Sequence, residues 1–126
     1  MLTSSFRVLR DGPGRISIAR WAPRGYPAGF RIYRKLAPGD WSRRHTASGR
    51  STWIDDASFE IGYAQQLAAL DPERVWRELH ALSMPAEPIL CCWEVPPFTA
   101  QNWCHRRLVA AWFEEQLGVT VPEWRG

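Results

Sequence analysis

The chain of 126 residues is long enough for one domain that buries its own core, and we expect residues 1–126 to form that single domain. Apolar residues make up 45% and charged residues 23% of the chain, proportions typical of a folded globular protein that exclude extensive disorder. No segment approaches about eighteen consecutive apolar residues, and the first residues lack the apolar centre of a signal peptide. We therefore expect a cytoplasmic protein without a membrane partner.

Positive charge is concentrated in the first half of the chain. Residues 1–63 hold eleven Lys or Arg against five Asp or Glu, whereas residues 64–126 hold five against eight. Fifteen of the sixteen basic residues are arginines, whose planar guanidinium groups suit bidentate phosphate binding and stacking on flat rings. A merely solvated, arginine-rich surface explains the same composition equally well.

Short β-type runs and loops are predicted in the first part of the chain. Residues 15–20 form the first expected core strand, because a β-type run follows a turn-like sequence there. Residues 21–29 are rich in proline, glycine and aromatic residues and predict a loop. Apolar and basic side chains alternate over residues 30–36, which favours a second strand, although a helical turn fits as well. The polar residues 37–56 predict a long loop.

Helical spacing of apolar residues begins after this loop. Ser58 is the expected N-cap of a first helix, which continues to about residue 70. Asp71 and Pro72 then provide the cap and the first residue of a second helix.

The last third of the chain predicts a strand, a polar turn and an amphipathic helix. The strand is expected over residues 89–93 and the helix over residues 103–117, with Gly118 as its C-cap and a short final strand at residues 119–121. Strands that alternate with helices are typical of the α/β class, so we expect a small, mainly parallel sheet flanked by helices.

Reactive side chains gather around the turn between that strand and that helix. Ligands of open α/β sheets bind beyond the carboxyl ends of the strands, where such turns lie, so we expect a reactive or ligand-binding site here. Its candidate residues are Cys92, Glu94, Cys104, His105, Arg106 and Arg107.

The residue types around this turn allow two kinds of chemistry. A thiolate at Cys104 would be favoured by the helix dipole and by Arg106, with His105 beside it as a base. The same helix N-terminus could instead bind a phosphate or carboxylate without covalent chemistry. Glu94 could act as a general base or anchor an arginine, and Cys92 should point to the same side of the strand.

Structural roles explain the same residues. Cys91 and Cys92 fit small buried core positions better than nucleophilic ones, and His105 could be a packed, hydrogen-bonded residue. Cys92, Cys104 and His105 offer zinc only three ligands, whereas a structural site needs four, and the cysteine spacing does not suggest a disulfide. We therefore expect no disulfide, no tightly bound structural metal and no cofactor.

Two motifs at this turn resemble the family catalogued as domain of unknown function 488. Residues 92–94, Cys-Trp-Glu, and residues 104–106, Cys-His-Arg, are similar to its L-L-C-x-E and C-H-R signature, and residues 16–20 and 36–38 are similar to its amino-terminal pattern. The chain departs from the family at Cys91, where an aliphatic residue is usual, and in a slightly longer connection between the motifs. The resemblance covers roughly residues 15–123.

That resemblance implies a small α/β domain with one polar cluster, and it implies no settled reaction. The residues that it assigns to this cluster are Arg20, Cys92, Glu94, Cys104, His105 and Arg106.

Three functions are open at this point. The first is a small enzyme acting on a nucleotide, a nucleobase or nucleic acid, in which arginines hold an anion and Trp21 stacks on a ring. The second is a non-catalytic module that binds nucleic acid or nucleotides through the basic half of the chain. The third is thiol chemistry at Cys104. The expected catalytic residues are Glu94, Cys104 and His105, and the expected ligand-binding residues are Arg20, Trp21, Arg43, Arg44, Cys92 and Arg106.

Overall fold

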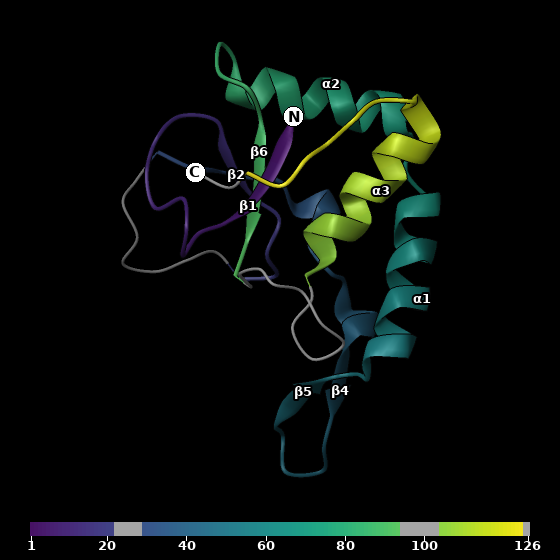
Figure 1. Cartoon of the computed structure of the whole chain (residues 1–126). Coiled ribbons are helices and arrows are strands. Elements are labelled where there is room, and N and C mark those ends of the chain that lie inside the picture. Colours follow the sequence, from purple (N-terminus) through teal and green to yellow (C-terminus); the bar gives the residue numbers. More distant parts are fainter. Residues whose placement is uncertain (22–28, 94–103, 125–126) are drawn as a thin grey trace.

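The computed structural model describes residues 1–21, 29–93 and 104–124 and has a parallel sheet with helices packed against it (Figure 1). This α/β architecture confirms the predicted fold class. The four strands of the sheet lie in the order β1-β6-β2-β3, and all neighbours are parallel. These strands are β1 (Leu2–Ser5), β2 (Arg15–Ser17), β3 (Arg31–Ile32) and β6 (Ile89–Cys92).

Strand β6 lies in the middle of the sheet, where Leu90 is opposite Thr3 of β1 and Ile16 of β2. Strand β1 was not predicted, because its sequence Leu-Thr-Ser-Ser lacks an apolar pattern. Its Thr3, Ser4 and Ser5 are nevertheless buried. The parallel pairing sends the chain segments that follow β2 and β6 to the same edge of the sheet.

In the described ranges, α2 (Pro72–Ser83) and α3 (His105–Leu117) pack against the sheet, and α1 (Asp56–Ala68) packs against α3. Helix α3 contacts β1 and β6 and also packs against α1, so that it lies between the sheet and α1 (Figure 1). The shared core is formed by fully buried side chains from all these layers, including Ile16, Ile18, Tyr63, Leu79, Leu90, Val109 and Phe113.

The helix ends follow their capping residues. The Asp55 carboxylate accepts a hydrogen bond from the backbone N–H of Ser58 at 2.9 Å, so α1 begins at Asp56 and the predicted cap at Ser58 is wrong. The prediction of Asp71 as the cap of α2, with Pro72 as its first residue, is confirmed. Gly118 ends α3 with a φ of 67°, the left-handed conformation that glycine adopts readily.

The region between β3 and α1 is more ordered than the predicted loop. It holds the 3₁₀ helices η1 (Arg34–Leu36) and η2 (Asp40–Ser42), and then an antiparallel hairpin of β4 (Arg43–His45) and β5 (Ser51–Trp53). The hairpin projects at the lower end of the molecule in Figure 1. The second strand, predicted over residues 30–36, is shorter than expected, because β3 ends at Ile32 and the chain then forms η1.

The strand expected at residues 119–121 does not form, and an isolated parallel bridge instead joins Thr3 to Glu123 two residues further along. None of the helices in the described ranges is long and apolar enough to span a membrane.

Candidate functional site

A cavity of about 240 Å³ lies where β6 ends and α3 begins. The cysteine–histidine cluster, which we define as Cys92, Cys104 and His105, forms one part of its lining. The aromatic wall, which we define as Trp21, Trp53 and Phe59, forms another part, and Arg20 lines the cavity too. The segments after β2 and after β6 thus reach one site at the carboxyl edge of the sheet, where the topology directs them.

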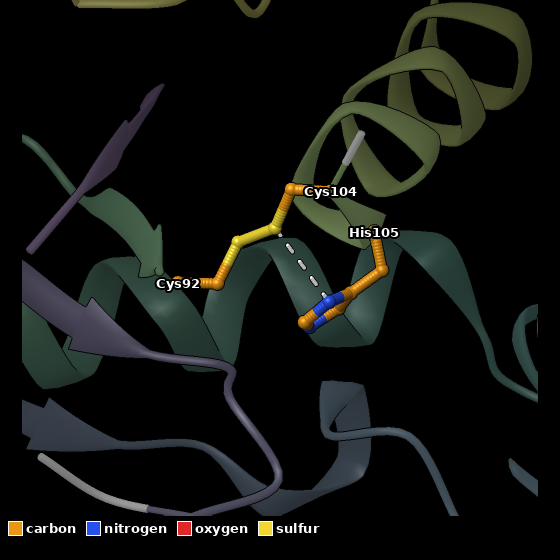
Figure 2. Close-up of side chains that lie close together, drawn as sticks. All are labelled: Cys92, Cys104 and His105. Carbon is orange, nitrogen blue, oxygen red and sulfur yellow. Dashed lines mark hydrogen bonds between the residues drawn. A yellow bond between two sulfur atoms is a disulfide. The ribbon is translucent and has the colours of Figure 1, made fainter. Parts of the chain in front are cut away.

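Cys92 and Cys104 are joined by a disulfide between the last residue of β6 and the N-cap of α3 (Figure 2). Their Cα atoms are 7.2 Å apart, and both side chains are buried. This disulfide overturns the expectation of three unpaired thiols. The sequence could not reveal it, because the pairing depends on the distance between the end of β6 and the start of α3 in the folded chain. Cys91 is unpaired and buried.

His105 is the first residue of α3, and a hydrogen bond to the backbone of Ile18, the residue directly after β2, orients its ring. Nε2 lies 2.6 Å from the carbonyl oxygen of Ile18, which can only accept, so Nε2 carries the proton and donates it. The other ring nitrogen, Nδ1, is then an acceptor and lies 3.8 Å from Sγ of Cys104 (Figure 2). Burial, opposed by the hydrogen bond to the Ile18 carbonyl and assisted by the charge of Arg106, lowers the pKa of His105 to about 4. The imidazole is neutral at neutral pH.

Arg106 is fully buried and its guanidinium contacts other groups of the protein. Nε and Nη2 donate to the Glu123 carboxylate at 3.0 Å and 2.7 Å, and Nη1 donates to Sγ of Cys92 at 3.1 Å. Arg106 therefore holds the sulfur of Cys92 through a hydrogen bond, and the Glu123 carboxylate pairs with the charge of Arg106. Sequence reasoning missed Glu123, because an acidic residue near the end of a chain carries no signal of burial.

The aromatic wall is joined to arginine side chains. The rings of Trp21 and Trp53 lie 5.6 Å apart, and the ring of Phe59 lies 6.0 Å from that of Trp53. The guanidinium carbon of Arg43 lies 4.5 Å from the ring centre of Trp53 and 4.9 Å from that of Trp21. About half of the surface of each tryptophan is exposed. This arrangement offers flat apolar surface beside a positive charge, which is suited to a planar ligand with anionic groups.

Arg20 lies beside the aromatic wall, with its guanidinium carbon 5.6 Å from the ring centre of Trp21. Its Nη2 donates to the Asp40 carboxylate at 2.7 Å and its Nη1 to the Pro38 carbonyl at 2.9 Å. This contact holds the pKa of Asp40 below its usual range. Part of the charge of Arg20 is thus already paired within the protein.

The structure brings most of the predicted site residues together. Arg20, Trp21, Cys92, Cys104 and His105 all line the cavity. Arg43 reaches the site through its contacts with the two tryptophans, Arg44 is exposed on β4, and Arg106 lies behind Cys92. Glu94, the predicted general base, lies outside the described residues. Phe59 belongs to the site but was predicted only as a core-facing residue of the first helix.

The cysteine–histidine cluster is also the group of side chains within the described ranges that could hold a metal ion. One donor atom from each of Cys92, Cys104 and His105 lies within 4.8 Å of the others. In the disulfide form both sulfur atoms are occupied by the bond between them.

Comparison of the chain with protein-family models, with curated proteins and with solved structures finds no match.

Proposed function

We propose that this protein is a small enzyme that binds a flat ring bearing phosphate, as in a nucleotide or in a base of a nucleic acid, and acts on it with the cysteine–histidine cluster. One observation carries the proposal: the aromatic wall and the cluster line the same cavity. A stacking surface beside reactive side chains is what a site for chemistry on a planar ligand requires.

The size of the cavity limits how such a ligand can bind. Its volume of about 240 Å³ is below the range of roughly 300–1,000 Å³ common for sites that enclose a whole drug-sized ligand. A single ring system is therefore the part that enters, and the phosphates stay outside, where the hairpin carries Arg43 and Arg44. Arginine suits this role because its planar guanidinium binds phosphate in a bidentate manner.

The cluster supplies a proton acceptor and a nucleophile when the disulfide is reduced. The neutral imidazole of His105 directs the lone pair of Nδ1 toward Cys104 and can accept a hydrogen bond from its thiol. A thiolate formed at Cys104 would favour the protonated ring and oppose the burial that lowers the pKa of His105. An N–H of Arg106 contacts the sulfur of Cys92 and stabilises negative charge there. These contacts favour Cys104 and His105 as the reacting pair and Cys92 as their partner.

A second candidate function is dithiol–disulfide exchange at Cys92 and Cys104. The disulfide itself favours it, since the pair lines an open cavity instead of lying wholly within the core. In that case the planar ligand would be dispensable, and reduction of a disulfide-bearing substrate would depend on both cysteines and not on Trp21.

Binding is tested by titrating the protein with mononucleotides, single-stranded and duplex oligonucleotides, and ring-free polyphosphate at two salt concentrations. Trp21→Ala should weaken ligands that carry a base by about 1–3 kcal/mol and leave polyphosphate unaffected. Trp112→Ala, a change on α3 away from this cavity, is the matched control. Equal losses for polyphosphate and nucleotide would contradict ring stacking.

Catalysis is tested separately from binding. His105→Gln and Cys104→Ser should abolish turnover of a bound nucleotide or oligonucleotide while the affinity stays close to that of the unchanged protein. If the reduced protein binds these ligands but turns none of them over, the protein is a binding module. If it binds none of them, the arginines are a solvated surface.

A further inference from the structure

We propose that the reduced form of the cysteine–histidine cluster binds one Zn²⁺ through Cys92, Cys104 and His105, with the fourth coordination position open to the cavity. This metal site goes beyond the function proposed above, because it depends on three side chains and not on the identity of the organic ligand.

The first argument is the spacing of the donor atoms. Zinc bonds of roughly 2.3 Å to sulfur and 2.0–2.1 Å to nitrogen, arranged tetrahedrally, separate the two donors by roughly 3.6 Å. Sγ of Cys104 and Nδ1 of His105 are 3.8 Å apart, and all three donor atoms lie within 4.8 Å of one another. Once the disulfide is reduced and the two sulfurs separate, one ion can lie between the three donors.

The second argument is the orientation of the histidine. Imidazoles that bind zinc almost always donate their other ring N–H to a carboxylate, a carbonyl or water, which fixes the tautomer. His105 has this arrangement, because Nε2 donates to the Ile18 carbonyl and leaves the Nδ1 lone pair directed at Cys104 (Figure 2). The hydrogen bond to the Ile18 carbonyl thus leaves Nδ1 unprotonated and available to bind a metal ion.

The third argument is the support behind Cys92. Nη1 of Arg106 donates to Sγ of Cys92, and Glu123 holds the guanidinium from the other side. Metal-bound thiolates are commonly stabilised by such outer hydrogen bonds. The two thiolates would balance the charge of the ion, while Arg106 and Glu123 balance each other.

The backbone leaves room for the sulfur atoms to separate. The Cα atoms of Cys92 and Cys104 are 7.2 Å apart, beyond the range of roughly 4.4–6.8 Å that disulfides usually span. Two zinc-bound sulfurs would lie roughly 3.8 Å apart in tetrahedral geometry. The wide spacing of these two backbones suits a bridging ion.

The change from disulfide to metal site can be written as a balanced sequence. A water-soluble phosphine and one water molecule convert the disulfide into two thiols, and the phosphine is oxidised to its oxide. Zn²⁺ then binds both sulfurs and releases their two protons to solvent. Disulfide and zinc exclude each other, so the oxidation state of the pair controls whether metal binds.

Three protein ligands beside an open cavity define a particular kind of zinc site. Structural zinc is enclosed by four protein ligands, whereas catalytic zinc has three and binds water or substrate at the fourth position. The cavity that the cluster lines provides that position. The absence of a fourth protein ligand argued against a structural zinc site in the sequence analysis. The same absence is expected for a zinc site whose fourth position is open to the cavity.

The test begins with anaerobic reduction of the full chain by the phosphine, loading with Zn²⁺ and desalting, followed by metal analysis. The reduced protein should retain about one zinc per chain and the disulfide form none. Co²⁺ loaded in the same way should give a thiolate-to-cobalt charge-transfer band and the intense visible bands of tetrahedral coordination. No retained zinc, or equal retention by the disulfide form, would overturn the proposal.

Variants then assign the ligands. Cys92→Ser, Cys104→Ser and His105→Asn should each weaken zinc binding by more than roughly 100-fold in competition with a chromophoric chelator, beyond the usual effect of losing an outer partner. Cys91→Ser and His80→Asn are matched controls, because Cys91 is the unpaired cysteine and the Nδ1 of His80 contacts the carbonyl of Trp76. Controls that weaken binding as much as the ligand variants would contradict the assignment.

A measurement on the unchanged chain covers the case in which a variant does not fold. Zinc should slow alkylation of Cys92 and Cys104 in the reduced protein, with the modified residues identified by peptide mass, and should leave the rate at Cys91 unchanged. Unprotected thiols at Cys92 and Cys104 would count against the site. Nucleotide titrations of zinc-free protein report on the proposed function independently, so the two proposals can fail separately.

Discussion

Arg106 and Arg43 both contact residues that line the cavity, and they are held in opposite ways. Arg106 has no exposed surface, and its charge is balanced by Glu123 and directed at the sulfur of Cys92. Arg43 is half-buried and lies over the rings of Trp21 and Trp53, which line the cavity. The arginines of the sequence therefore occupy two different environments, one buried against a carboxylate and a sulfur atom and one lying over two aromatic rings.

This difference in burial predicts that the two arginines contribute differently to the free energy of unfolding. A buried ion pair is costly to break, because the remaining charge is left without a partner in a medium of low polarity. A guanidinium over an exposed ring contributes less, since water competes for it and the alternative is a solvated cation.

The largest expected effect is at the buried pair. Glu123→Gln should lower the free energy of unfolding by about 3–5 kcal/mol, because the change removes a buried carboxylate that pairs with the Arg106 guanidinium. Chemical denaturation at neutral pH measures it. Asp40→Asn is the control, since the Asp40 side chain is 94% exposed where it meets Arg20 and its loss should change stability little. Similar losses in both variants would show that Arg106 and Arg20 are held alike, and the comparison would fail.

The disulfide should have the next largest effect. The two cysteines are 12 residues apart in sequence, and closing a loop of this size stabilises a protein by about 2–4 kcal/mol. Reduction in the presence of a metal chelator should lower the denaturation midpoint by a corresponding amount. A variant with both cysteines replaced by alanine should not respond to the reductant. If the unchanged protein is also indifferent, the pair does not form a stabilising disulfide in solution.

The sequence predicted the layered fold because local signals agree with it. Asp71 and Pro72 mark the start of α2 by capping and by the fixed φ of proline, and Gly118 marks the end of α3. The signals failed where tertiary contacts decide. Strand β1 is polar and is stabilised by pairing with β6, and the hairpin of β4 and β5 has no alternation of apolar and polar residues to reveal it.

The site was predicted in its location more than in its chemistry. Parallel topology was enough to bring Arg20 and His105 to one cavity, because both follow the carboxyl ends of neighbouring strands. The pairing of Cys92 with Cys104 and the burial of Glu123 depend on distances between segments that are remote in sequence. No periodicity or spacing encodes those distances.

A smaller effect is expected at Arg43, beside the two tryptophans of the aromatic wall. Arg43→Gln removes the guanidinium from both rings and its hydrogen bonds to Ser51, and should cost about 1 kcal/mol of stability. Arg44→Gln is the matched control, because Arg44 is the next residue on β4 and is exposed. Thermal or chemical denaturation of the two variants compares them directly. Equal stabilities would mean that the contacts of Arg43 contribute nothing to the stability of the fold.

The smallest effect belongs to a carboxylate outside the cavity, Glu78, which extends the comparison to a half-exposed pair. The hydroxyl of Tyr33 donates to Glu78 at 2.6 Å and Nζ of Lys35 donates at 3.0 Å, and these bonds lower the pKa of Glu78 below 4.5. A carboxyl whose pKa is lower in the folded state stabilises the fold above its unfolded pKa. That contribution is lost as the pH falls through the folded pKa.

Acid titration of stability should therefore be shallower below about pH 4.5 in Glu78→Gln than in the unchanged protein. Tyr33→Phe, which removes the largest cause of the shift, should lie between them. Parallel acid curves for all three proteins would show that solvent screens this pair. A charged contact would then contribute measurably to the free energy of unfolding only where it is buried, as at Glu123.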